Sequence, residues 1–110
     1  MKLSLLQTFL LLSLLLLSGC KHEESLPVSQ ETLINVLIDV HAAEAAVTHL
    51  TGEEKDSVIN VYYSQIMEIH RMKREVFDTC VAILRRNPEL TEEIYEQIQE
   101  TLKKKNVEEE

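Results

Sequence analysis

The residues with the clearest potential for chemistry lie in the stretch Asp39-Val40-His41-Ala42-Ala43-Glu44-Ala45. At about 100° per residue of an α-helix, His41 and Glu44 lie about 60° apart, on the same arc as the apolar Leu37. An imidazole and a carboxylate at this spacing could bind a metal ion, as Glu-x-x-His pairs do in di-iron helical bundles. They could also form a structural pair, in which a buried His41 donates a hydrogen bond to Glu44 or to a tyrosine of a neighbouring helix.

A metal site would need more ligands than this stretch supplies. Such sites use three or four ligands, and the sequence offers no second pair at matching spacing. Asp39 is expected on the opposite side of the helix, and His70, at the end of a second apolar stretch, is the nearest further candidate. We therefore predict a structural pair, no cofactor and no catalytic residues. A metal or small-ligand site at His41 and Glu44 remains the alternative.

A second reactive position is Cys20, at the end of a leucine-rich run that begins one residue after Lys2. A positive residue, a short apolar core and the small residues Ser18-Gly19 are typical of a secretory signal. With Cys following, the arrangement resembles the lipobox of bacterial lipoproteins. The resemblance implies that diacylglycerol is added to the Cys20 sulfur, that the chain is cleaved between Gly19 and Cys20, and that the new amine is acylated, for example with palmitate. The other interpretation is a signal anchor in which Cys20 has no role.

Cleavage there would leave 91 of the 110 residues, enough for one small domain. With Lys2 removed, 10 basic residues face 19 acidic ones, a net charge of −9. Because a strongly acidic domain is repelled by phosphate backbones, we predict no nucleic-acid partner, and membrane contact through the lipid on Cys20 alone. Cys80 is then the one thiol left, and the apolar residues at helical spacing around it predict that it is buried.

Residues 20–28 are predicted to be the lipidated cysteine followed by a flexible tether, since Lys21 to Ser25 are polar without apolar periodicity and this stretch ends at Leu26-Pro27. Lys21 resembles an outer-membrane sorting residue, and with the following glutamates it resembles the export signals of Bacteroidota surface lipoproteins, although His22 interrupts that pattern. We therefore predict an outer-membrane location and leave its periplasmic or cell-surface face open.

The rest of the chain predicts an all-α fold, with a helical domain over residues 29–105. Four amphipathic helices are expected in an antiparallel bundle, of which the first is the most central because it has the widest apolar arc. Ser29 is a candidate N-cap, Gly52 a stop for the first helix, and Asp56 or Ser57 the start of the second. A break at residues 70–72 precedes the third helix. Asn87-Pro88 starts the fourth, which is expected to end at Lys103–Lys105, ahead of a frayed tail over residues 106–110.

Taken in order, several of these features resemble one family. The resemblance rests on Pro27, the Asp39–Ala45 motif, Tyr62-Tyr63, the Phe77–Leu84 helix and Asn87-Pro88-Glu89. Together they resemble the domain of unknown function 4296 family, small lipoproteins of Bacteroidota without an established activity. The resemblance covers roughly Pro27 to Leu102 and implies a fold and a location, but no reaction.

The expected function is therefore that of a lipid-anchored helical domain of the outer membrane that interacts with an unidentified protein and is not an enzyme. The alternative is a domain that binds a metal or small ligand at His41 and Glu44.

Overall fold

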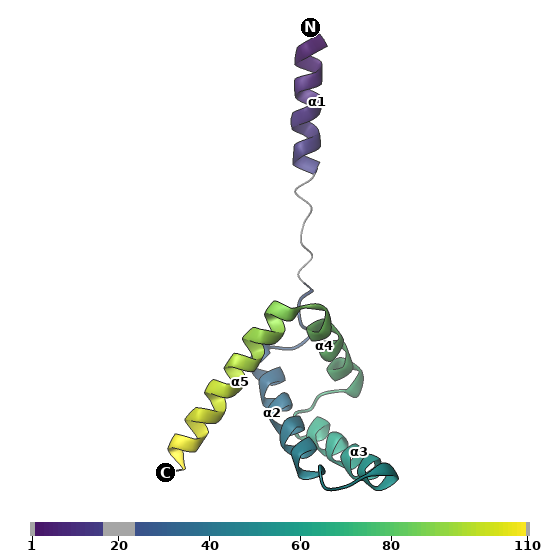
Figure 1. Ribbon diagram of the computed structural model, residues 1–110, viewed down its shortest axis with the longest axis vertical. Coiled ribbons are helices and arrows are strands. Elements are labelled where there is room, and N and C mark those ends of the chain that lie inside the picture. Colours follow the sequence, from purple (N-terminus) through teal and green to yellow (C-terminus); the bar gives the residue numbers. More distant parts are fainter. Residues whose placement is uncertain (1, 17–23, 110) are drawn as a thin grey trace.

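The structure, a computed structural model, describes residues 2–16 and 24–109. Over these residues all regular structure is helical, which confirms the predicted all-α class. The helices are α1 (Lys2–Leu16), α2 (Gln30–Ala46), α3 (Gly52–Ile69), α4 (Arg74–Arg86) and α5 (Pro88–Glu108), shown in Figure 1.

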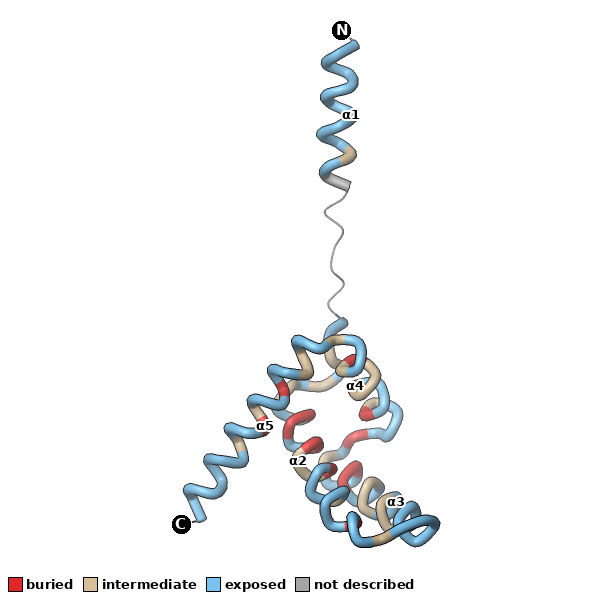
Figure 2. The backbone as a smooth tube through the Cα atoms, viewed as in Figure 1, coloured by how far each residue is buried: buried red, intermediate tan, exposed pale blue. Residues whose placement is uncertain are grey.

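The core is organised around α2, as its wide apolar arc predicts. The Ser29 hydroxyl caps this helix by accepting a hydrogen bond from the Thr32 amide at 3.2 Å. Helix α2 packs against both α3 and α5, and α4 packs against α5. Figure 2 shows the buried residues gathered along the faces of these helices that turn toward each other. The α2 residues in the core are Leu33, Ile34, Val36, Leu37 and Val40.

The predicted antiparallel bundle is wrong. With α1 included the molecule is extended, measuring 76 × 38 × 25 Å, and within the domain α4 and α5 diverge from their shared corner (Figure 1). One cause is the connection between them, because Asn87 alone separates the two helices. An antiparallel helical hairpin needs a loop of about 2–5 residues, so a single residue turns the chain through a corner instead. Helix α5 is also longer than α4, with 21 residues against 13, so its end projects past its neighbour.

The boundary between α2 and α3 also differs from the prediction. Helix α2 ends at Ala46, well before Gly52, and the Thr48 hydroxyl donates to the Ala45 carbonyl at 2.9 Å. Such a side-chain bond competes with continued helix. Gly52, at φ 62°, is the first residue of α3 rather than the stop of the preceding helix. Helix α3 therefore begins four residues before Asp56.

The predicted break between α3 and α4 is confirmed. Helix α3 ends at Ile69, and Arg71 adopts a left-handed conformation at φ 51°. Ile69, the last residue of α3, is apolar but 72% exposed. It lies about 200° around the helix from the buried Met67, so the two cannot face the same neighbour.

Helix α5 begins as the sequence predicts, with Pro88 in the first turn and the Asn87 side chain accepting from the Leu90 amide at 3.1 Å. It continues to Glu108, three residues beyond the expected end at Lys105. From Leu102 to Glu109 every residue is exposed, and this end of α5 projects past the other helices as an arm (Figures 1 and 2).

The segment leading into the domain is held against it. Leu26 and Val28 pack on the core, and the Glu24 carboxylate accepts from the Arg86 guanidinium at 2.8 and 3.1 Å. Residues 24–28, the described part of the predicted tether, thus contact the domain at the corner of α4 and α5 (Figure 1).

Helix α1 lies apart from the other four (Figure 1). Among the described residues, no helix combines the length and apolarity needed to cross a membrane. The predicted cleavage and lipidation positions, Gly19 and Cys20, lie outside the described residues.

Candidate functional site

The structure separates His41 and Glu44 from the core. Their side chains are 45% and 52% exposed, and His41 Nδ1 lies 3.8 Å from the nearer Glu44 oxygen, beyond hydrogen-bond distance. The expectation of a buried pair is therefore wrong. Although both residues follow the apolar arc, the continuous buried face of α2 ends at Val40. Beyond that point the cover is partial, since Val47 is buried whereas His41 and Glu44 face solvent.

Glu44 instead contacts Tyr63, a tyrosine of the second predicted helix. The Tyr63 hydroxyl donates to Glu44 Oε1 at 2.8 Å, so the carboxylate, not His41, has the tyrosine as its partner. The Tyr63 ring meets the Phe77 ring edge-on at a centroid separation of 6.1 Å, and the Arg74 guanidinium lies 4.8 Å from its centroid. This cluster joins α2, α3 and α4.

The environment of Tyr63 disfavours its phenolate. Partial burial, the hydrogen bond to Glu44 and the negative charge of that carboxylate together raise the pKa of Tyr63 to about 12, with Arg74 acting in the opposite direction. A phenol held protonated in this way is a structural hydrogen-bond donor at neutral pH and is not poised as a base.

His70 contacts a different carboxylate from the one expected. Its Nε2 lies 2.6 Å from Asp39 Oδ2, which joins the end of α3 to the side of α2. Asp39 thus lies on a different side of α2 from His41, as predicted, but His70 contributes nothing to the His41–Glu44 pair. Over the described residues, no group of three or more His, Cys, Asp or Glu side chains could hold a metal ion.

The exposed face of His41 lines a groove between α2 and α5. Its ring lies beside that of Tyr95, with centroids 5.8 Å apart and planes tilted by 45°. The groove has a volume of about 460 Å³ and is almost entirely apolar. Its lining residues are Ile38, His41 and Ala42 from α2, and Tyr95, Ile98 and Leu102 from α5.

Sequence reasoning missed Tyr95 and therefore this groove. The four apolar residues Leu90, Ile94, Ile98 and Leu102 recur every four residues and by themselves indicate one narrow apolar stripe. Tyr95 precedes Ile98 by three residues and Leu102 by seven, a spacing that widens the apolar face of α5 to a second side. Ile98 is buried, but Tyr95 and Leu102 remain 44% and 41% exposed. The helix thus has more apolar surface than α2 covers.

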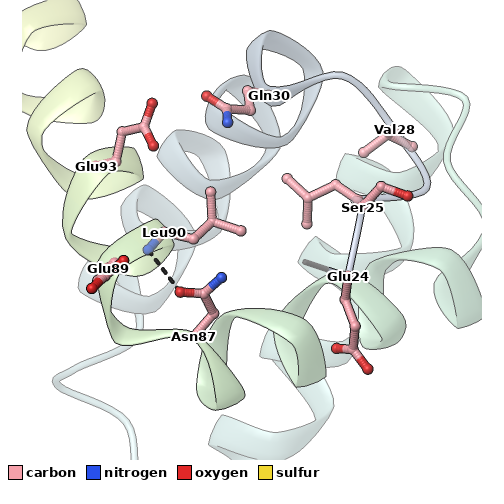
Figure 3. A pocket seen from close by; sticks show the side chains of 9 residues that line it. Glu24, Ser25, Val28, Gln30, Asn87, Glu89, Leu90 and Glu93 are labelled. Carbon is pink, nitrogen blue, oxygen red and sulfur yellow. Dashed lines mark hydrogen bonds between the residues drawn. The ribbon is translucent and has the colours of Figure 1, made fainter. Parts of the chain in front are cut away.

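A second cleft lies where the incoming segment meets the start of α5. It has a volume of about 480 Å³ and carries three carboxylates, from Glu24, Glu89 and Glu93. Figure 3 shows Leu90 extending from α5 toward the segment that bears Ser25, while Asn87 is occupied in capping the helix. Since Glu24 is paired with Arg86 and the cleft is open, this arrangement holds the domain's N-terminal segment rather than shaping a ligand site.

A comparison with protein-family models shows to which family this chain belongs. The family model described as "Domain of unknown function (DUF4296)" matches residues 25–108. The chain belongs to this family. The match includes the groove, the Glu44–Tyr63 cluster and all of α2 to α5, and it confirms the resemblance seen in the sequence. No match was found among curated proteins or among solved structures.

The DUF4296 region of this chain also contains its buried thiol. Cys80 is fully buried in α4, as predicted, and burial raises the pKa of the thiol. Reactive cysteines are partly exposed and have a lowered pKa. Cys80 is therefore a small core residue with the environment opposite to that of a nucleophile.

Proposed function

We propose that this member of the DUF4296 family is a lipid-anchored, non-enzymatic protein-interaction module of the outer membrane. The observation that carries the proposal is the apolar groove between α2 and α5, with the exposed side chains of Tyr95 and Leu102 at its edge. Its floor includes the buried Ile98.

The groove has the composition of a protein-binding surface. Binding surfaces combine an apolar centre with aromatic side chains, and tyrosine is enriched there because it offers a large rigid ring with a polar end. A furrow between two helices accepts a third helix, whose apolar side chains fill it at three- and four-residue spacing. Ala42 on the α2 wall favours such packing, since a side chain of one carbon allows a close approach.

The proposed anchor follows from the residues before the domain. Helix α1 has 15 residues with exposed leucines along it, and the sequence Ser18-Gly19-Cys20 follows it closely. A helix of this length spans about 22 Å, which suits the apolar core of a cleaved signal. Two or more acyl chains on Cys20 would give stable attachment to a bilayer.

The anchor and the Glu24–Arg86 contact would together orient the domain. Cys20 lies four residues before Glu24, a distance of at most about 14 Å in an extended chain. Because Arg86 binds Glu24 at the corner of α4 and α5, that corner would face the head groups. Helices α2 and α5 lead away from the corner (Figure 1), so the groove would lie about 10–20 Å beyond it, above the membrane surface and within reach of other membrane-attached proteins.

Site-specific photo-cross-linking in intact cells tests the interaction. A photoreactive amino acid placed at Tyr95 should give a discrete cross-linked protein band. The control position is Lys104, which is exposed on the same helix but lies about 180° around it from Tyr95. A band from both positions, or from neither, would contradict the proposal.

A further inference from the structure

We propose that the occupant of the α2–α5 groove is α5 of a second copy of this chain, in an antiparallel pairing about a two-fold axis. This inference rests on the proposed function, because it names the partner for the same groove.

The first argument is the charge order along α5. Its first thirteen residues carry five glutamates and no basic residue, whereas Lys103, Lys104 and Lys105 follow one another near its end. The glutamates are Glu89, Glu92, Glu93, Glu96 and Glu100. In a parallel pair of such helices, like charges would lie beside like. An antiparallel pair places the lysine run of each helix beside the acidic part of the other, while Glu108 lies beyond that run.

The second argument is the register that the apolar residues select. Tyr95 and Leu102 are seven residues apart and lie about 20° from each other on the helix, so they share one face. A two-fold axis midway between them, near Ile98 and Gln99, places Tyr95 of each copy opposite Leu102 of the other. The two exposed apolar side chains of the groove would then cover each other across the interface.

The same register aligns the charges. Lys103 lies at the level of the second copy's Ile94, between its Glu92 and Glu96. On the helix all three charged residues lie about 60–100° to the same side of Tyr95. A two-fold axis perpendicular to the helices brings matching sides together, so each Lys103 would meet two carboxylates, and the arrangement occurs twice. All three side chains are exposed in the single chain and free to reach across.

The third argument is the projecting arm. Leu102 and Lys104 still border clefts that α5 shares with α2, whereas residues 105–109 extend beyond α2, so this end of the arm offers a helix surface without steric obstruction from its own domain (Figure 1). In the pairing it would lie along the partner's α5. Attachment of both copies to one membrane would raise their effective concentration, which favours pairing through a modest contact area.

Charge-reversal variants test the pairing. The full-length lipidated protein is kept in mild detergent, and its molar mass is measured by sedimentation or light scattering across a concentration series. The wild type should reach twice the monomer mass. Lys103→Glu should raise the dimer dissociation constant about tenfold at low salt, because it places like charges together. The matched control Lys104→Glu makes the same change in net charge on the opposite side of the helix and should leave the constant within about twofold.

The decisive variant reverses the charges on both sides of the proposed contact. Glu92→Lys, Glu96→Lys and Lys103→Glu on one chain should restore the dimer, because in a two-fold pairing every reversed charge meets a reversed partner. A heterologous partner would not be compensated in this way. A monomeric wild type, equal effects of the Lys103 and Lys104 variants, or no restoration would each overturn the second-copy inference.

Cross-linking supplies a second measurement and separates the two proposals. Gln99→Cys lies beside the two-fold axis and should form a disulfide-linked dimer in membranes, whereas Lys104→Cys should not. Without a Gln99 disulfide, the inference is overturned. If the chain is also monomeric but a photoreactive group at Tyr95 captures a different protein, the proposed function stands with another partner. If it captures nothing, both proposals are wrong.

Discussion

Tyr63 connects three helices through three different interactions. Its hydroxyl donates to Glu44, its ring edge meets Phe77, and Arg74 lies over its face. Hydrogen bonds to charged groups stabilise folded proteins more than neutral ones do, and an edge-on aromatic pair adds to the area that it buries. These contacts hold the end of α2 beside α3 and α4, at the point where the continuous buried face of α2 has ended.

The raised pKa of Tyr63 predicts how stability depends on pH. The folded protein binds the phenolic proton more tightly than the unfolded chain, whose tyrosines titrate near 10. The stabilisation is therefore complete below pH 10 and is lost as the pH rises from 10 toward about 12. Urea unfolding at pH 9 and pH 11 should show a smaller loss of unfolding free energy for Tyr63→Phe than for the wild type. An equal loss in both proteins would contradict this assignment.

For single residues, the sequence predicted which side chains lie on α2 but not which side chains of other helices they contact. A helical wheel places His41 and Glu44 on the apolar arc, yet it carries no information about how far the neighbouring helices extend over that arc. Asp39 was set aside because it faces another side, and that side is where the end of α3 brings His70 within 2.6 Å. Partner choice depends on the path of α3, which local spacing does not determine.

Among the elements, α5 has the largest effect on the shape of the molecule. It starts directly after α4 because Asn87 both ends one helix and caps the next. With one residue at the corner, α5 leaves α4 at an angle, contacts α2 along its middle and then projects beyond it (Figure 1). The groove with Tyr95 and Leu102 results from this divergence.

The Asn87 cap is open to a direct test. Asn87→Ala removes the acceptor for the Leu90 amide and should lower the free energy of unfolding by about 1 kcal/mol, within a range of about 0.5–2. The matched control Asn106→Ala changes the same residue type within the exposed arm of α5, where alanine is the better helix former, and should not destabilise. Chemical denaturation of both variants measures these changes. An equal loss of unfolding free energy in the two variants would show that the corner does not depend on the cap.

The element boundaries show what local signals can predict. The starts of two helices, at Ser29 and at Asn87-Pro88, were predicted correctly because each depends on a side chain acting on the nearby backbone. The break at residues 70–72 was also predicted correctly, and there the chain closes α3 with backbone hydrogen bonds around the left-handed Arg71. Gly52 was misassigned because a glycine that adopts positive φ can precede a helix as well as follow one. The compact bundle failed because crossing angles depend on loop length and on contacts between helices, which lie outside any single apolar pattern.

For the whole molecule, the chain combines a domain with a leading segment attached to it at one corner. The Glu24–Arg86 pair is exposed, so its contribution to stability is small, within about 1 kcal/mol. Its effect is geometric: together with Leu26 and Val28 it fixes where the chain enters the domain. In the proposed function this point lies at the membrane, and α2 and α5 carry the groove away from it.

The proposed lipid anchor predicts a specific result for Cys20→Ser. Because both acylation and cleavage need the thiol, the variant should remain unprocessed and should lack the acyl chains. Its mass should be that of the full 110-residue chain, whereas wild type from the same membranes should have lost residues 1–19 and partition into detergent. Cys80→Ala is the control, since Cys80 is buried in the core, and that variant should be processed and acylated as the wild type is. A processed but unacylated wild-type chain would contradict the anchor.

Native mass spectrometry of the protein extracted from its own membranes in mild detergent tests the central claim most directly, because one spectrum reports both the lipid and the partner. The account predicts a chain of residues 20–110 that carries acyl groups on Cys20 and is bound to another protein chain, with a second acylated copy giving twice that mass. Substitution of Leu102 by Glu in the groove should convert this complex to the acylated single chain, since a charge would be buried in an apolar contact. A wild-type spectrum that contains the single chain alone, at every concentration and in each detergent, would contradict the account.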